Sequence, residues 1–287
     1  MKSCIECHER FDGPLWRCPS CGFTPRQLAH VTSFCEPEGS DGFDPDAFDR
    51  LARLEHASFW FRSRSRLIVW ALRRYFPHVQ RILELGCGTG FVLQGLCEAF
   101  PGLSFAGAEL HLEGLRHAAE RVPAAELFQL DARRLPFESE FDVIGAFDVL
   151  EHIEMDERVL REMHRAVKPT GGIVLTVPQH PWLWSPADEY AEHKRRYRRA
   201  ELLRKVSTAG FIVRRITSFV SLLLPGMAAM RLRTRLAGER FDADHEHHAA
   251  ARVTGALERV ADVERALIGR GMDLPVGGSL LVVATRT

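Results

Sequence analysis

The segment 81–90 (Arg-Ile-Leu-Glu-Leu-Gly-Cys-Gly-Thr-Gly) ends a short apolar run with three glycines at alternate positions. This order predicts a strand, a tight turn and a helix over 91–100. Glycine lets the turn pass close to a ligand because it has no Cβ, and the helix start offers unpaired N–H groups. Glu84 suits a ligand with a cationic end better than a pyrophosphate. An ordinary strand-to-helix turn is the alternative, because the glycine pattern alone is a weak signal.

Acidic residues stand at the ends of the next three predicted strands. Glu109 ends the second strand, Asp131 follows the third and Asp148 follows the fourth. In a doubly wound sheet the ligand lies across the carboxyl ends of the strands. There Glu109 could accept hydrogen bonds from both hydroxyls of a ribose, and Asp131 one from an adenine amino group. Each acid alone could be a helix N-cap or a turn residue, but their common register indicates a nucleotide-like cofactor.

Alternating apolar runs and helical patterns predict the sheet that carries these residues. The expected fold class is α/β, a doubly wound, mostly parallel, seven-stranded sheet with helices on both faces. The predicted strands are 81–85, 104–109, 126–130, 141–147, 172–177, 211–216 and 278–285. The expected organisation is an N-terminal unit over 1–30, a linker with roof helices over 31–78, and the sheet domain over 79–287, with a helical insertion at about 220–275.

Residues 55–220 resemble a class I S-adenosylmethionine-dependent methyltransferase of the large type 11/12 group, which has a Rossmann-like fold. The resemblance rests on Glu84–Gly90, Glu109, Leu130–Ala132, Phe141–Val143, Asp148–His152 and Leu160–Gly172. The Gly-x-Gly-x-Gly spacing differs from the Gly-x-Gly-x-x-Gly of dinucleotide sites. Family members often have Asp at the position of Glu109, and the longer Glu should still reach the ribose. The resemblance implies that S-adenosylmethionine contacts Glu84, Gly86, Cys87, Gly88, Gly90, Glu109, Leu110, Asp131, Ala132, Phe147 and Asp148.

A helical pattern that begins at about Asp46 places aromatic residues and arginines ahead of the first main strand. Such a stripe is more often part of a core. However, methyltransferases of this type usually carry helices there that roof the cofactor, and a subfamily has a signature similar to the His-x-x-Phe-Trp-Phe-x-x-Arg found over 56–64. Trp60 and Arg64 are therefore expected to touch cofactor or substrate, and the planar fork of Arg64 suits a carboxylate.

Three histidines and a tyrosine are the candidates for the acceptor side. Methyl transfer from a sulfonium needs mainly positioning, plus a base where the acceptor carries a proton. His152 follows the fourth predicted strand, and His180, His193 and Tyr197 follow the fifth. Histidine titrates near neutral pH, and His193 and Tyr197 are favoured as pocket residues. The alternative is a capping histidine and a core tyrosine.

The group Asp148-x-x-Glu151-His152 allows a second interpretation. It resembles the divalent-metal group of some ubiquinone-pathway O-methyltransferases and small-RNA 3′-end methyltransferases. The same letters occur in many metal-free relatives, so this metal is the minor alternative. Metal binding is also not favoured at His245, His247 and His248, which lie in an expected exposed loop.

Four of the 7 cysteines form two Cys-x-x-Cys pairs, Cys4 with Cys7 and Cys18 with Cys21. Four thiolates make a closed tetrahedral site, and so short a segment would take its folding energy from the metal. The segment resembles a zinc ribbon, with Zn²⁺ in a structural role because a four-thiolate site keeps no open position. A redox or adventitious pair is the alternative. Metal-bound thiolates fit a reducing cytoplasm better than a disulfide framework does.

The net charge and the hydropathy pattern limit the classes of binding partner that the sequence favours. Lys+Arg and Asp+Glu both total 38, and this neutral balance disfavours a nucleic-acid partner. No apolar run approaches the ~20 residues that cross a bilayer. The apolar segment 219–230, followed by arginines, could cap the sheet, lie on a membrane surface, cover an apolar substrate or make a dimer contact. The basic cluster 194–199 is either a solvated helix start or a site for phosphate or carboxylate. The oligomeric state is not readable.

The leading hypothesis is a methyltransferase that acts on a small-molecule or lipid-like, anionic acceptor, by O-methylation. The second hypothesis is an RNA methyltransferase that grips nucleic acid with the ribbon. The third is an assembly protein that holds S-adenosylmethionine or its product without turnover.

Overall fold

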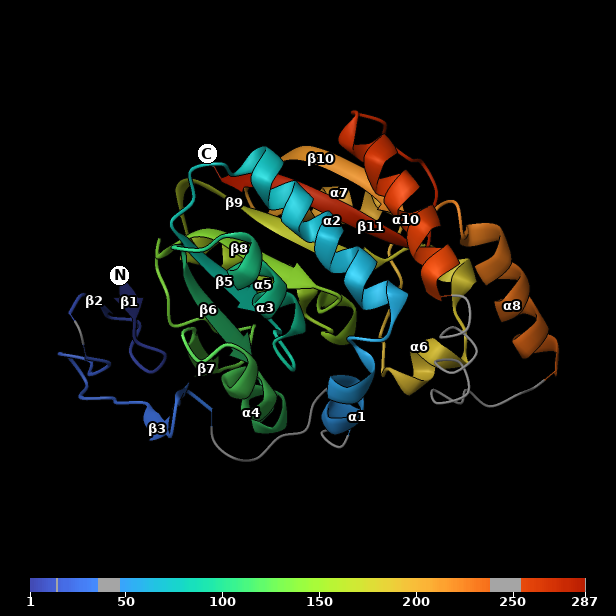
Figure 1. Cartoon of the computed structure of the whole chain (residues 1–287). Helices are drawn as coiled ribbons and strands as arrows, with labels where there is room; N and C mark the ends of the chain where they lie inside the picture. The colour runs from blue at the N-terminus through green and yellow to red at the C-terminus, as the bar shows by residue number, and fades with distance from the viewer. Residues whose placement is uncertain (14, 36–46, 238–253, 287) are drawn as a thin grey trace.

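The computed structural model describes residues 1–13, 15–35, 47–237 and 254–286, and a single large sheet forms its centre (Figure 1). The strands of this sheet are β3 (Arg26–Leu28), β4 (Val31–Ser33), β5 (Arg81–Leu85), β6 (Ser104–Glu109), β7 (Glu126–Gln129), β8 (Phe141–Phe147), β9 (Val167–Pro178), β10 (Phe211–Phe219) and β11 (Ser279–Arg286). Their order is β10-β11-β9-β8-β5-β6-β7-β4-β3. Within the group β5 to β9, every pair of neighbouring strands is parallel. Strand β11 lies between β9 and β10 and is antiparallel to both. The predicted doubly wound, mostly parallel sheet is confirmed.

The predicted count of seven strands is wrong, because the described residues form a sheet of nine strands. The additional two, β3 and β4, come from the junction of the N-terminal unit and the linker. Strand β4 pairs in parallel with β7, and β3 pairs antiparallel with β4. Three-residue segments carry no usable periodicity. Strand β4 forms here because the edge of β7 offers unpaired backbone N–H and C=O groups, and β3 then pairs with β4.

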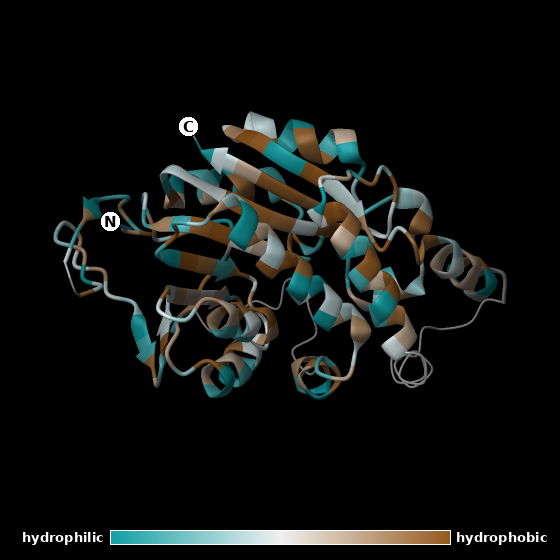
Figure 2. Ribbon diagram, turned by 45° about the horizontal axis from the view of Figure 1, so that its top comes forward, coloured by the Kyte–Doolittle hydropathy of each residue, from teal (hydrophilic) through white to brown (hydrophobic). Residues whose placement is uncertain are grey.

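Helices cover both faces of the sheet, as Figures 1 and 2 show. The first face carries α2 (Phe59–Tyr75), α3 (Phe91–Ala99), α4 (Leu112–Arg121) and α10 (Thr254–Gly269), whose apolar side chains join one buried cluster. The second face carries α5 (Asp156–Ala166) and α7 (Arg199–Thr208), which join the other cluster. Hydrophobic strands therefore lie between two polar outer layers, which is the arrangement that burial of both sheet faces requires.

The elements that surround the site follow the carboxyl ends of the strands. They are η1 (Leu150–His152) after β8, and η2 (Pro181–Leu183) with α6 (Pro186–Tyr190) after β9. Helix α1 (Ala47–Leu54) precedes α2, and α8 (Leu224–Ala237) follows β10. Among the described residues, no helix is both long and apolar enough to cross a membrane. The predicted loop with His245, His247 and His248, and part of the predicted insertion over 220–275, lie outside the described residues.

A small N-terminal unit docks on the segment between β7 and β8 through a two-stranded hairpin, β1 (Lys2–Ser3) with β2 (Arg10–Phe11). The Ser3 N–H donates to the carbonyl of Pro136 at 3.0 Å, and Lys2 forms an antiparallel bridge with Phe137. The unit is thus joined to the main domain by backbone pairing as well as by the chain itself.

Candidate cofactor and acceptor site

The glycine turn after β5 is held by close backbone packing. Gly86 has φ 70°, and a Cβ there would lie 2.4 Å from the Val149 side chain. Gly90 has φ 79°, and a Cβ there would lie 2.9 Å from Cα of Ala118. Both positions thus need glycine for conformation and for space. The turn brings the amino end of α3 against the ends of β5 and β6, where N–H groups can face a ligand.

Glu84 lies beneath this turn and is buried, with 3% of its surface exposed. Its Oε2 atom has no hydrogen-bond partner in the described structure. Burial raises the pKa of the Glu84 carboxyl to about 8, partly offset by the nearby Arg64 guanidinium. A buried carboxylate oxygen without a partner is costly, and a ligand with an ammonium group would satisfy it.

Glu109, at the end of β6, turns its carboxylate onto the glycine turn. One oxygen accepts from the Gly88 N–H at 3.0 Å, and the other accepts from the N–H groups of Leu110 at 2.7 Å and His111 at 3.2 Å. These bonds fix the carboxylate at the strand end where a ribose is expected. The predicted neighbours Gly86, Gly88, Glu109 and Leu110 are therefore brought together.

Other predicted cofactor residues lie in the same region with different surroundings. Asp131 forms an ion pair with Arg133 at 2.8 Å, and Ala132 packs at the edge of the core. Cys87 and Phe147 are both buried, at 5% exposure each. The Cys87 side chain joins the apolar cluster, so only its backbone could face a ligand.

The roof of the site is formed by α2. The Arg64 guanidinium donates to Oδ2 of Asp148, and only 8% of Arg64 is exposed. The Trp60 ring stacks on Phe219, with centroids 5.7 Å apart and an interplanar angle of 10°. Arg64 thus connects the predicted roof to the end of β8. Trp60 instead packs against the end of β10, where an apolar pocket is lined by Trp60, Arg64, Phe219, Leu223, Val260 and Ile268.

A second support of the glycine turn has no signature in the sequence. The Thr89 hydroxyl lies 2.7 Å from both carboxylate oxygens of Glu55, and Arg121 of α4 donates to Glu55 at 2.6 Å. Glu55 is 5% exposed. This buried network ties the segment after α1 to the turn and to α4. Thr89 stands between two glycines, but the sequence pattern does not predict its partners Glu55 and Arg121, which are 34 and 32 residues away.

On the acceptor side, His193 is oriented by a buried aspartate. Its Nδ1 atom lies 2.9 Å from Oδ1 of Asp188, which is 1% exposed. The His152 ring stands edge-on to His193, with centroids 4.8 Å apart. Because the carboxylate accepts, Nδ1 of His193 carries the proton and Nε2 is left as an acceptor.

Asp188 was not singled out by sequence reasoning, yet it joins three segments. Ser185, which is the N-cap of α6, donates to it through its N–H at 2.9 Å, Arg196 donates at 2.6 Å, and Arg231 of α8 at 3.1 Å. His193, Arg196 and Arg231 together lower the pKa of the Asp188 carboxyl far below its usual range, against the effect of burial. The signal that could have found it is Ser-x-x-Asp over 185–188, the spacing of a capping box.

His180 and Tyr197 have different surroundings from His152 and His193. The backbones of His180 and Tyr197 pair at 2.9 Å, but the Tyr197 side chain is fully buried and donates to Asp156 at 2.7 Å. The ring of His180 packs near Trp182, at 5.4 Å, and burial lowers the pKa of His180. Tyr197 thus lies among core side chains, where its hydroxyl makes a structural hydrogen bond.

Glu151 completes a group with the two histidines. Ligand atoms of Glu151, His152 and His193 lie within 4.8 Å of one another. Glu151 is fully buried and neither of its carboxylate oxygens has a hydrogen-bond partner. Burial, and then the charge of Asp148, raise the pKa of Glu151 well above its usual value. Asp148, by contrast, is paired with Arg64.

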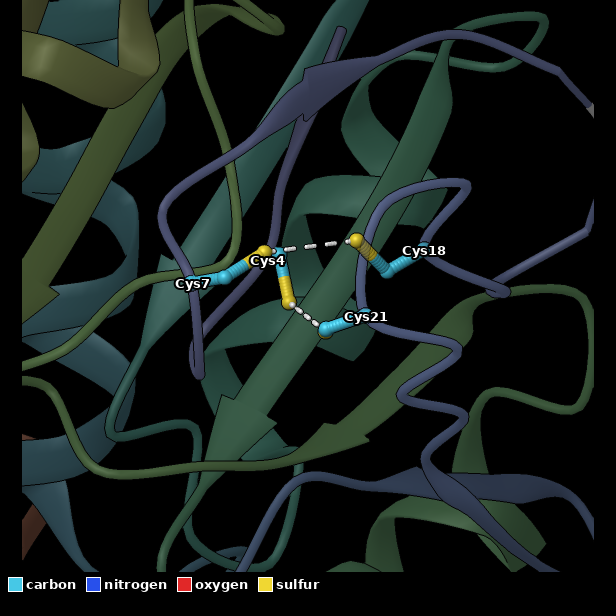
Figure 3. A group of neighbouring side chains, drawn as sticks. All are labelled: Cys4, Cys7, Cys18 and Cys21. Atoms are coloured by element: carbon cyan, nitrogen blue, oxygen red, sulfur yellow. Dashed lines mark hydrogen bonds between the residues drawn. The ribbon is translucent and has the colours of Figure 1, made fainter.

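The four cysteines of the two Cys-x-x-Cys pairs converge in the N-terminal unit (Figure 3). The sulfurs of Cys4 and Cys21, and those of Cys7 and Cys18, are 3.5 Å apart, and all four lie within 4.8 Å of one another. A tetrahedral zinc site with Zn–S bonds of ~2.3 Å has sulfurs about 3.8 Å apart. The donor set and its spacing fit that ion.

Comparison with known proteins bears on the sheet domain. Residues 83–175 match the family described as "Methyltransferase domain". The chain carries a class I S-adenosylmethionine-dependent methyltransferase domain. The matched residues include the glycine turn, Glu109, Asp131 and Asp148, while the roof, the N-terminal unit and the segment 180–197 lie outside them.

Individual relatives share parts of this methyltransferase domain. A ubiquinone biosynthesis O-methyltransferase of Pseudomonas aeruginosa is 30% identical over 108 residues, which are 36% of this chain and 46% of that protein. A probable S-adenosylmethionine-dependent methyltransferase of Mycolicibacterium smegmatis is 25% identical over 168 residues, 56% of this chain and 62% of that protein. The chain thus matches less than two thirds of the length of each relative.

The fold is also found among solved structures. Phosphoethanolamine N-methyltransferase 2 of Haemonchus contortus, in complex with S-adenosyl-L-methionine, superposes with a TM-score of 0.58 and 20% identity. The match covers 88% of this chain and 61% of the other. At this identity the likeness concerns the fold of the methyltransferase domain, and the acceptor has to be inferred from the site.

Proposed function

We propose that the protein transfers the methyl group of S-adenosylmethionine to an oxygen of a small, partly apolar acceptor. The observation that carries the proposal is the pairing of two features across the strand ends. On one side, the glycine turn, Glu84 and Glu109 offer one unsatisfied buried carboxylate oxygen and a ribose acceptor. On the other side, His193 is held by Asp188 with its Nε2 left as an acceptor.

In this proposal, different residues hold different parts of the cofactor. S-adenosylmethionine supplies a methyl group that is already activated by the sulfonium charge. Glu84 would hold the ammonium end, Glu109 the ribose and Asp131 the adenine amino group. Arg64, paired with Asp148, would close the site from above and exclude water. Catalysis is then mainly positioning, which can supply about 7–11 kcal/mol of a barrier.

His193 would act as the general base in this scheme. It would accept the acceptor's proton at Nε2, while its Nδ1–H stays donated to Asp188. The buried carboxylate would stabilise the imidazolium that forms, as in other histidine–carboxylate pairs. His152 would line the pocket, His180 would stand at its edge beside Trp182, and Tyr197 would support the 178–180 backbone from the core.

The acceptor class follows from the surroundings. Apolar side chains are exposed near the acceptor side, and Trp182, in the segment after β9, is 59% exposed. Leu222 and Leu232, near or on α8, are also exposed, at 47% and 58%. These side chains support a lipid-like acceptor, and peripheral membrane contact through α8 belongs to the same proposal.

A divalent cation at Glu151, His152 and His193 is the second candidate mechanism. Two unpartnered buried carboxylate oxygens beside two histidines fit such an ion. The ion would supply Lewis-acid stabilisation to an acceptor oxygen, and His193 would then be a ligand through Nε2 rather than a base. Activity that survives extensive treatment with a chelator and metal-free buffer would favour the general base.

Zinc in the N-terminal unit is proposed as structural, held by Cys4, Cys7, Cys18 and Cys21. The neutral net charge supports a small-molecule acceptor over nucleic acid, and we propose a cytoplasmic location on the ground of the thiolate-rich unit. A gel shift with RNA at graded salt concentrations tests the nucleic-acid alternative, because phosphate contacts give a steep salt dependence.

The central test is calorimetric titration of the zinc-loaded protein with S-adenosylmethionine and S-adenosylhomocysteine. Micromolar binding is expected, and no binding would overturn the proposed function. A radiolabelled methyl-transfer screen over phenols, carboxylic acids and amphipathic lipids then identifies the acceptor. Binding without transfer to any acceptor class would instead favour an assembly protein.

A further inference from the structure

The ribose end of the cofactor site is connected to the N-terminal unit by side chains that no motif contains. Strand β4 lies in parallel register with β7, and Ser33 stands opposite Gln129. The Phe34 N–H donates to the Gln129 carbonyl at 2.8 Å and continues the ladder. The N-terminal unit thus supplies a strand whose last residue faces the strand leading to Asp131.

A buried pair of hydrogen bonds runs from this strand to the ribose acceptor. The Ser33 hydroxyl donates to Oε1 of Gln129 at 2.6 Å, and Nε2 of Gln129 donates to the Leu110 carbonyl at 3.1 Å. Ser33 is 2% exposed and Gln129 is 7% exposed. Because the Leu110 carbonyl can only accept, it requires the Nε2 end of the Gln129 amide, and Oε1 is thereby turned toward the Ser33 hydroxyl, which also lies 3.2 Å from the Cys35 carbonyl.

Leu110 is consequently held at both of its backbone groups. Its carbonyl accepts from Gln129, and its N–H donates to the Glu109 carboxylate at 2.7 Å. A rotation of this residue would redirect the carboxylate that faces the ribose. Ser33 and Gln129, 96 residues apart in sequence, are thus connected to one of the three backbone N–H groups that hold the Glu109 carboxylate; the other two belong to Gly88 and His111.

The cysteine loops contact the segment after β4 through aromatic residues, among them Phe23, whose ring stacks on Phe34 at 6.5 Å, and Trp16. Trp16 lies between the two Cys-x-x-Cys pairs, and its ring contacts Phe34 edge-on at 4.8 Å. It also contacts Phe137 at 5.7 Å and Phe128 of β7 at 6.0 Å. A single residue, Arg17, separates Trp16 from Cys18, so an ordered metal site fixes the position of this ring. Loss of the metal would free Trp16 and loosen β4 from β7.

We propose that Ser33 and Gln129 are positioning residues for the cofactor ribose, and that through them cofactor affinity depends on the metal-loaded N-terminal unit. This inference rests on the proposed function, since it takes Glu109 as the ribose acceptor. The N-terminal unit is then a part of the cofactor site. Its metal acts at a distance, through a strand, an amide and a backbone turn.

The test measures S-adenosylhomocysteine binding by calorimetry to the full chain, with zinc and after removal of zinc by a chelator. Zinc content is checked by metal analysis, and folding of the main domain by circular dichroism. One buried hydrogen bond corresponds to about a two- to tenfold change in affinity. We expect zinc removal and Ser33→Ala each to raise Kd about three- to tenfold, while S33A keeps its zinc.

Two controls separate positioning from general loosening. Thr32→Ala, on the same strand as Ser33, removes an exposed hydrogen bond to Gln27 of β3 and should leave Kd unchanged. Ser33→Thr keeps the hydroxyl and should restore most of the affinity. Zinc removal from S33A should add little, because both changes act on one relay.

The outcomes are distinguishable. If Kd is the same with and without zinc, or if S33A behaves like T32A, the inference is overturned and the proposed function stands. If the zinc-loaded wild-type chain fails to bind S-adenosylhomocysteine, the proposed function falls and this inference falls with it.

Discussion

On the cofactor side of the site, the contacts come largely from backbone and acids at the ends of β5 and β6. On the acceptor side, they come from side chains that converge from η1, α6, the segment after α6, and α8. The ends of β5 and β6 lie within residues 83–175, which match the methyltransferase family, whereas the segment 180–197 lies outside that match. A backbone-built site can bind one cofactor in many proteins. A site built from convergent side chains can change its acceptor by a few substitutions.

The largest effect is expected on the acceptor side. His193→Ala should lower kcat by about 10²–10⁴-fold, because a positioned general base contributes that much, and cofactor affinity should stay unchanged. Single-turnover transfer and calorimetry on the same sample measure the two quantities. Full activity of His193→Ala would show that another group is the general base. A parallel loss of cofactor binding would show that the two sides of the site do not act independently.

The next effect belongs to the cofactor side. Gly86→Ala places a Cβ 2.4 Å from Val149 at φ 70°, so the turn must shift, and we expect cofactor affinity to fall about 100-fold. Gly102→Ala is the matched control. It also has positive φ, at 94°, but nothing lies within 4 Å of the added Cβ. Equal losses in the two variants would mean that backbone strain, rather than the site, is being measured.

Glu84 gives cofactor binding a pH dependence of its own. Burial raises the pKa of its carboxyl to about 8, whereas a cationic ligand needs the carboxylate. Between pH 6 and 7.5 the proton must leave on binding, so affinity should rise with pH by up to about tenfold per unit. Titrations at several pH values measure this slope, and Glu84→Gln should abolish it.

The folded state binds this proton more tightly than an unfolded chain does. Glu84 therefore reduces stability progressively as pH rises from about 4.5 to 8.

The smallest effect concerns Tyr197. Tyr197→Phe removes one hydrogen bond to Asp156, which keeps Lys205 at 2.5 Å as a partner. We expect the free energy of unfolding to fall by about 1 kcal/mol with little change in kcat. Denaturant titration and turnover measure both. A loss of kcat larger than tenfold at unchanged stability would instead place the hydroxyl in the acceptor pocket.

The two sides also differ in how far the sequence predicts them. Glycines at fixed spacing and acids at strand ends are local signals, so the placement of Gly86, Glu84 and Glu109 could be anticipated. Asp188 and the network of Glu55 with Arg121 could not, because their partners are set by tertiary packing of separate segments. His193 was a candidate among 13 histidines, and only the aspartate beside it distinguishes it.

The same reasoning accounts for the strand count. The predicted strands β5 to β11 are long enough for their apolar runs to be recognised. Strands β3 and β4 have three residues each, and β4, to which β3 pairs, has its other pairing partner, β7, almost a hundred residues away. A pairing of that kind is a property of the exposed sheet edge rather than of the paired segment.

The position of β11 has a consequence for synthesis of the protein. Among the described strands, β10 pairs only with β11, and β11 is formed by residues 279–286. While a ribosome is still producing the segment between them, β10 has no partner and the edge of β9 is open. At about 5–20 residues per second, this state lasts several seconds for each chain. Chaperones that recognise apolar strands would therefore meet this protein at one defined stage of its translation.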